Sequence, residues 1–75
     1  MVAVAWYDGL VERIELLREF PQQGRIVSEW HEETVREVLH RPYRVIYECR
    51  GDSIEILTLS HFRQPLPPDR VEGSL

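Results

Sequence analysis

The sequence predicts an α+β domain in which one N-terminal amphipathic helix packs on a three-stranded antiparallel sheet. Apolar residues recur at steps of three or four over residues 6–20, which is typical of a helix with one apolar side. Residues 35–61 instead contain three short runs rich in β-branched and aromatic residues, separated by turn-forming dipeptides. One helix followed by a run of strands indicates a two-layer domain.

The helix is predicted from its apolar stripe and from its C-terminal end. The stripe contains Trp6, Leu10, Ile14, Leu17 and Phe20, and Val11 lies beside it. Pro21 ends the pattern and Gly24 follows it, which together are a common helix stop signal. Residues 2–5 fit either the start of this helix or a short strand. After the helix, we expect residues 25–30 to dock in extended form, with Trp30 as an apolar anchor.

Three strands are predicted over residues 35–40, 43–49 and 54–61. Pro42 separates the first two, and Gly51-Asp52 favours a tight hairpin turn between the second and third. Alternation in the second strand places Tyr43, Val45, Tyr47 and Cys49 on one face and Arg44, Ile46, Glu48 and Arg50 on the other. In the third strand, Ile54, Ile56, Thr58 and Ser60 alternate with Glu55, Leu57, Leu59 and His61.

The length of the chain allows one domain. We assign residues 1–64 to it and residues 65–75, which contain three prolines and no periodicity, to a flexible C-terminal tail. A chain of this size buries only about 60% of its unfolded surface, so a partner or a homodimer would add to its stability.

The charge pattern argues against broad nucleic-acid binding. The net charge is −4, and it is concentrated in residues 1–33, whereas residues 34–64 sum to +1. The single cysteine, Cys49, excludes an intrachain disulfide, and no signal peptide or membrane-spanning apolar run is visible. We therefore expect a cytoplasmic protein with no membrane partner.

Four short motifs occur in order along residues 10–64. They are Phe20-Pro21-Gln22-Gln23-Gly24-Arg25, Arg36-Glu37-Val38-Leu39, Pro42-Tyr43-Arg44-Val45-Ile46-Tyr47, and Ile54-Glu55-Ile56-Leu57 followed by His61-Phe62-Arg63. Their order and spacing resemble the RelE/ParE toxin superfamily of type II toxin–antitoxin systems, which includes plasmid stabilisation proteins.

The resemblance implies a small bacterial or archaeal toxin whose cognate antitoxin wraps around it. RelE-like members cut mRNA on the ribosome without a metal, and ParE-like members poison DNA gyrase. Gly24-Arg25 followed by residues 42–47 looks closer to the ParE branch. The usual toxin opens with a strand and two helices, whereas only one helix fits here, so we expect a form shortened at the N-terminus, unless Met1 is not the natural start. A sheet lacking that strand exposes an edge and favours a homodimer.

The resemblance also suggests catalytic roles for Arg44, His61 and Arg63. In RNA-cutting members the arginine matching Arg44 holds the scissile phosphate, and a residue near His61 transfers protons. Against a nuclease, Phe62 has no hydroxyl, Gln64 stands where an arginine is often found, and no tyrosine follows the second strand. The alternative is a structural role, in which Arg44 pairs with Glu48 of the same strand, or with Glu37 or Glu55 across the sheet, and we favour this role.

A second candidate set is a basic strip that would bind phosphate or an acidic antitoxin segment. It contains Arg36, Arg41, Arg44 and Arg63, and the alternative interpretation is a solvated face. The three histidines have no metal-ligand spacing and no glycine-rich phosphate loop is visible, so we predict no metal and no cofactor.

The favoured function is therefore a toxin-like protein that acts by binding proteins, namely an antitoxin and DNA gyrase. One alternative is a metal-independent, ribosome-dependent mRNA endonuclease of the RelE type. The other is an inactive, shortened relative that still folds and dimerises.

Overall fold

A computed structural model describes the backbone of residues 2–70 and the side chains of residues 4–70. In chain order the elements are α1 (Val2–Glu19), the short 3-10 helix η1 (Pro21–Gln23), β1 (Arg25–Ile26), β2 (Val35–His40), β3 (Tyr43–Arg50) and β4 (Ser53–His61). The predicted class, one helix packed on an antiparallel sheet, is confirmed. The predicted number of strands is one too low, because the two residues of β1 are too few to produce a recognisable alternation.

The structure decides between the two alternatives for residues 2–5 and corrects the predicted C-terminal end of α1. The helix already includes Val2, so the opening residues are the start of the helix and not a short strand. Phe20 lies just beyond the helix with φ −128° and ψ 73°, and its side chain is exposed. The ring of the following Pro21 disfavours the helical conformation at Phe20, which removes this residue from the apolar stripe.

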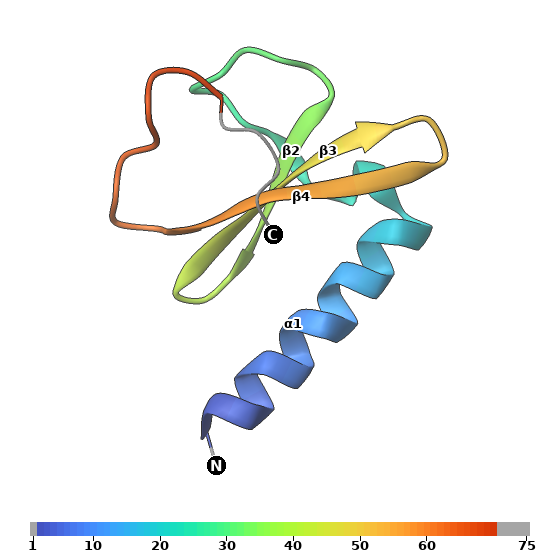
Figure 1. Cartoon of the computed structure of the whole chain (residues 1–75), viewed down its shortest axis with the longest axis vertical. Helices are drawn as coiled ribbons and strands as arrows, with labels where there is room; N and C mark the ends of the chain where they lie inside the picture. The colour runs from blue at the N-terminus through green and yellow to red at the C-terminus, as the bar shows by residue number, and fades with distance from the viewer. Residues whose placement is uncertain (1, 71–75) are drawn as a thin grey trace.

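The four strands form one antiparallel sheet in the order β1-β2-β3-β4, so each strand pairs with its neighbour in sequence. Figure 1 shows the sheet with α1 running along one side of it. Gly51 and Asp52 form the turn between β3 and β4, and Gly51 has φ +58°, a backbone conformation that favours glycine.

A β-bulge in β4 changes which face its side chains occupy. Tyr47 pairs with Ile56 and Ile46 pairs with Thr58, so Leu57 is an extra residue between them. Strict alternation therefore stops at Leu57, and Leu59 lies on the same face as Ile56 rather than on the face of Leu57. The predicted alternation of the third strand holds only before the bulge, since an inserted residue inverts every position after it.

Each face of the sheet has its own apolar core. On the face covered by α1, the buried residues are Leu10, Leu17, Val38, Val45 and Tyr47. On the opposite face, which we call the second face, they are Val27, Trp30, Val35, Ile46 and Leu57. The segment between β1 and β2 supplies Val27 and Trp30 to this second core, so Trp30 is the anchor that the sequence predicted.

Residues after β4 also reach the second face. Leu66 packs against the second core, and Trp30 Nε1 donates a hydrogen bond of 2.8 Å to the carbonyl oxygen of Pro67. Arg70 forms ion pairs with Glu48 and Glu32. The flexibility assigned to residues 65–75 stays a prediction, and its last part, residues 71–75, lies outside the described residues.

Tyr47 ties the connection after α1 to the sheet. Its side chain is fully buried, and its hydroxyl donates to the Pro21 carbonyl oxygen (2.7 Å) and accepts from the Gly24 amide (3.0 Å). A Cβ added at Gly24 would lie 2.5 Å from Tyr47 Oη and 2.6 Å from the carbonyl oxygen of Glu37. Only glycine allows the chain to pass this close to the sheet.

We expect Gly24→Ala to lower the free energy of unfolding by about 1–3 kcal/mol, because neither the Glu37 carbonyl nor the packed Tyr47 ring can move aside freely. Urea denaturation followed by circular dichroism measures this change. The exposed neighbour Gln23 provides the control, and Gln23→Ala should stay within about 0.5 kcal/mol. Equal stability of the two variants would contradict the proposed role of the close contact.

Candidate functional site

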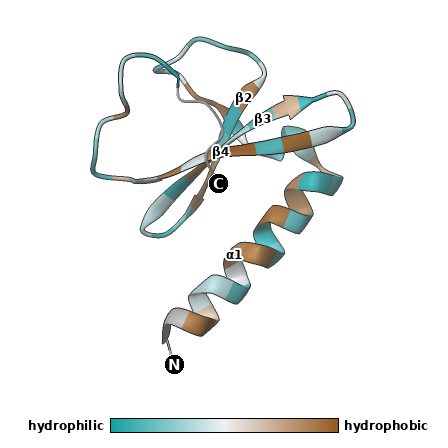
Figure 2. Cartoon of the chain, in the orientation of Figure 1, coloured by the Kyte–Doolittle hydropathy of each residue, from teal (hydrophilic) through white to brown (hydrophobic). Residues whose placement is uncertain are grey.

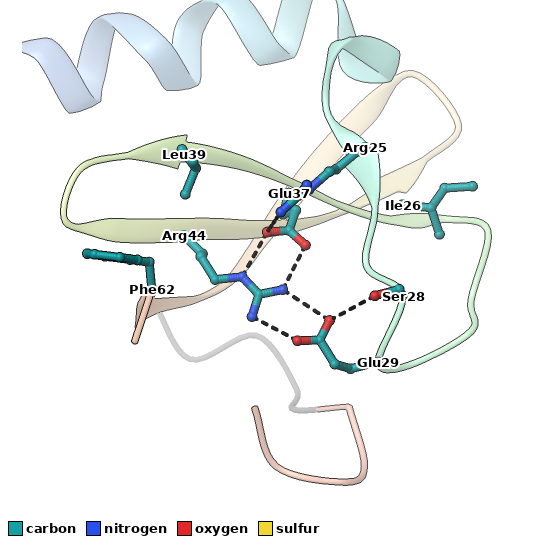
Figure 3. A pocket seen from close by; sticks show the side chains of 8 residues that line it. All are labelled: Arg25, Ile26, Ser28, Glu29, Glu37, Leu39, Arg44 and Phe62. Carbon is teal, nitrogen blue, oxygen red and sulfur yellow. Dashed lines mark hydrogen bonds and ion pairs between the residues drawn. The ribbon is translucent and has the colours of Figure 1, made fainter. Parts of the chain in front are cut away.

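Arg44 is the centre of a charged cluster on the second face. Its Nε donates to Glu37 Oε1 and its Nη2 to Glu37 Oε2, both at 2.7 Å (Figure 3). Its Nη1 and Nη2 also donate to the two carboxylate oxygens of Glu29, at 2.9 and 3.1 Å. The guanidinium therefore makes four hydrogen bonds to two carboxylates.

Strand register brings Arg44 and Glu37 together. Arg44 pairs with Leu39 and Glu37 pairs with Ile46, so the two charged residues are diagonal neighbours on one face of β2 and β3. Both are buried, with Glu37 only 3% exposed. Glu29 reaches them from the connection between β1 and β2. Pairing with a glutamate is the role that the sequence favours for Arg44, and of the three candidates Glu37, on the neighbouring strand, is the partner.

The charges in this cluster stabilise one another. The hydrogen bonds that Arg44 donates to Glu37 first, and then to Glu29, raise the pKa of Arg44, and the same hydrogen bonds from Arg44 lower the pKa of Glu29. Arg25 Nη2 lies 3.7 Å from Glu37 Oε1, and the Arg25 side chain is 76% exposed. Two guanidiniums thus face two carboxylates, so the cluster carries no strong net charge.

An open cavity of about 400 Å³ lies over this cluster. Its lining residues are Arg25, Ile26, Ser28, Glu29, Glu37, Leu39, Arg44 and Phe62. Ile26, Leu39 and Phe62 are each about two-fifths exposed, so they form an apolar rim around the charged floor (Figure 3). The sequence did not reveal this cavity, because its residues come from four separate segments of the chain.

The other candidate arginines lie elsewhere. Arg36 is on the face of the sheet covered by α1, where it pairs with Tyr47 and its Nη1 donates to the Gly24 carbonyl oxygen at 2.8 Å. Arg41 is exposed in the turn between β2 and β3. Arg63 follows β4, and its guanidinium lies 5.4 Å from the centre of the Phe62 ring. The structure therefore does not bring the four arginines of the predicted strip onto one surface.

His61 ends β4 on the face covered by α1. It pairs with Tyr43, and the two rings are 5.6 Å apart. Tyr43 in turn lies 5.7 Å from the Trp6 ring of α1. Arg44 follows Tyr43 in β3 and points to the opposite face, so His61 and Arg44 lie on different sides of the sheet. Catalytic roles for Arg44, His61 and Arg63 stay predictions.

A second charged cluster, which the sequence did not predict, surrounds Glu48. Arg70 donates to both carboxylate oxygens of Glu48 at 2.8 Å, Arg50 Nε donates at 2.9 Å and Thr34 Oγ1 at 3.2 Å. These bonds, above all those from Arg70, lower the pKa of Glu48 from 4.5 to about 2. Arg70 was assigned to the tail, so no sequence pattern linked it to β3.

Within residues 4–70, no group of three or more histidine, cysteine, aspartate or glutamate side chains is arranged to hold a metal ion. No helix in the described part of the chain is long and apolar enough to cross a membrane.

One helix packed on an antiparallel sheet defines a small α+β domain. A family model described as the ParE toxin of type II toxin–antitoxin systems, parDE, matches residues 2–66. The chain therefore belongs to the ParE toxin family. Comparisons with curated proteins and with solved structures gave no match. The sequence resemblance to the RelE/ParE superfamily is confirmed, and membership implies a cognate antitoxin as a partner.

We expect Arg44→Leu to destabilise the fold by about 3–5 kcal/mol, because Glu37 is then a buried carboxylate without its main partner. Urea denaturation measures the loss. The double variant Arg44→Leu/Glu37→Leu should recover most of it, since it removes both buried charges. An additive loss in the double variant would show that Arg44 stabilises the sheet by packing rather than by charge.

Glu48 should make stability sensitive to acid. Its pKa is lowered in the folded state, so its contribution is present above its unfolded pKa near 4.5 and is lost as the pH falls toward about 2. In Arg70→Ala, which removes the largest cause of the shift, we expect lower stability at pH 7 and a smaller decrease between pH 4.5 and 2. Chemical denaturation across this pH range tests both. Parallel pH profiles for the two proteins would contradict the assignment.

Proposed function

We propose that this member of the ParE toxin family acts by binding proteins, first a cognate antitoxin and, as its cellular target, DNA gyrase. Family membership supports the toxin class. The observation that favours protein binding over RNA cleavage is the state of Arg44. Its guanidinium already makes four hydrogen bonds to Glu37 and Glu29 and is 8% exposed.

A nuclease of the RelE type requires free cations next to the scissile phosphate and a base near the 2′-hydroxyl. Arg44 could bind a phosphate only by giving up carboxylate partners, which would leave Glu37 buried without its closest counter-charge. The candidate base, His61, lies on the opposite face of the sheet. A net charge of −4 also disfavours RNA binding.

The test is controlled expression in a bacterial host, with growth, transcript integrity and DNA damage measured together. We expect growth arrest with intact transcripts and induction of a DNA-damage reporter. His61→Ala should arrest growth as the parent does, because His61 has no catalytic task in a protein that works by binding. Co-expression of the cognate antitoxin should restore growth.

Two outcomes would overturn the proposal. Ribosome-dependent transcript cleavage that disappears in His61→Ala would establish the nuclease. Normal growth with folded protein present would favour an inactive relative. Circular dichroism of the purified protein separates the second outcome from simple misfolding.

A further inference from the structure

Two charged groups that line the cavity above Arg44 are open to a ligand. Arg25 Nη2 lies 3.7 Å from Glu37 Oε1, which is too far for a hydrogen bond, and the Arg25 side chain is 76% exposed. The Glu29 carboxylate accepts two hydrogen bonds from Arg44 and one from Ser28 Oγ, and its side chain is still 42% exposed. Because a carboxylate has about four lone-pair sites, Glu29 keeps an acceptor position for a further donor.

The same cavity has an apolar wall. Leu39 pairs with Arg44 across β2 and β3, and it lies two residues along β2 from Glu37, so both side chains are on the second face. Figure 2 shows hydrophilic and hydrophobic segments along β2, and Figure 3 shows Phe62 beside Arg44 on the side away from Glu29. Leu39 and Phe62 stay about two-fifths exposed although they line a cavity, so a ligand with an apolar part would cover them.

The balance of charge in the cavity selects for a ligand that carries both signs. A simple anion bound to Arg25 would also lie near the carboxylates of Glu37 and Glu29, which repel it. A simple cation bound to Glu29 would lie near the guanidiniums of Arg44 and Arg25. A ligand with one charge of each sign avoids both repulsions when its anionic end is at Arg25 and its cationic end is at Glu29.

We propose that this cavity binds a zwitterionic small molecule with an apolar side chain, of which an apolar α-amino acid is the simplest. The ligand carboxylate binds Arg25, whose planar guanidinium matches its two oxygens, and the ligand ammonium donates to Glu29. The apolar side chain contacts Leu39 and Phe62. A cavity of about 400 Å³ is within the range of small-molecule sites.

The proposal goes beyond protein binding, because it gives the second face a ligand of its own. The contacts would join three separate segments, namely β1 through Arg25, the connection after β1 through Glu29, and β2 through Leu39. A ligand that binds only the folded chain stabilises it. The assay uses the purified full chain, so its result does not depend on growth arrest or on an antitoxin.

The test is a titration of the full chain with L-leucine, followed by isothermal calorimetry and by amide chemical shifts in NMR spectra. We expect a Kd of about 1 mM or lower, which a ligand of this size can reach with two charged contacts and one apolar contact. The largest shift changes should occur at Arg25, Glu29, Leu39 and Phe62. At about ten times Kd, the Tm should rise by about 5–10 °C.

Leucine analogues separate the three contacts. 4-Methylpentanoate lacks the ammonium group, 3-methylbutylamine lacks the carboxylate, and glycine lacks the apolar side chain. Each should bind at least about tenfold more weakly than leucine, since hydrogen bonds between charged groups and the burial of an aliphatic side chain each contribute about this much. N-acetyl-leucine, which represents the C-terminus of a peptide, should also bind about tenfold more weakly, because its nitrogen carries no charge.

Two variants with a matched control locate the site. Arg25→Gln should weaken leucine binding about tenfold, whereas Arg41→Gln removes the same charge from an exposed position outside the cavity and should leave the affinity unchanged. Leu39→Thr, which keeps a residue suited to a strand, should weaken the binding of leucine without changing that of glycine. Circular dichroism verifies that each variant is folded.

Four results would contradict the proposal. They are the absence of leucine binding to the folded chain, equal affinity for leucine and 4-methylpentanoate, unchanged binding in Arg25→Gln, and equal affinity for leucine and N-acetyl-leucine. The last of these would identify a peptide C-terminus as the occupant in place of a free amino acid.

Discussion

The buried ion pair between Arg44 and Glu37 is the constraint on which the second face of the sheet depends. It links β2 to β3 across their shared register, and through Glu29 it holds the segment that follows β1. A buried carboxylate is destabilising unless a cation pairs with it. If either Arg44 or Glu37 bound another group instead, the other residue would be left as a buried charge without its partner. This is why Arg44, a residue that the family resemblance connects with phosphate chemistry, is better explained here as part of the structure.

The two faces of the sheet differ in the side chains that they bury. The second face buries its charges in pairs, with Arg44 near one end and Glu48 near the other, around a small apolar core. The face covered by α1 carries the larger core and places His61 beside Tyr43. Arg44 and His61 are thereby separated by the thickness of the sheet. RNA cleavage would require both residues at one catalytic centre, whereas protein binding does not.

Much of this arrangement was readable from local patterns. The helix follows from its apolar period, β2 and β3 from alternation and from Pro42, and the hairpin turn from Gly51. What the patterns missed has two physical origins. The bulge at Leu57 adds one residue without any change in composition, so alternation alone cannot detect it. The contacts of Arg70 with Glu48 depend on where an irregular segment returns to the sheet.

The sequence by itself determined the fold class and membership of a toxin superfamily, because periodicity, turn chemistry and short motifs can all be read along the chain. Tertiary structure decided which charges meet. Glu29 and Arg44 are far apart in sequence and only the folded sheet brings them within hydrogen-bonding distance. It also decided which charged and apolar side chains line one open cavity, since exposure depends on what the rest of the chain packs against and not on the local pattern.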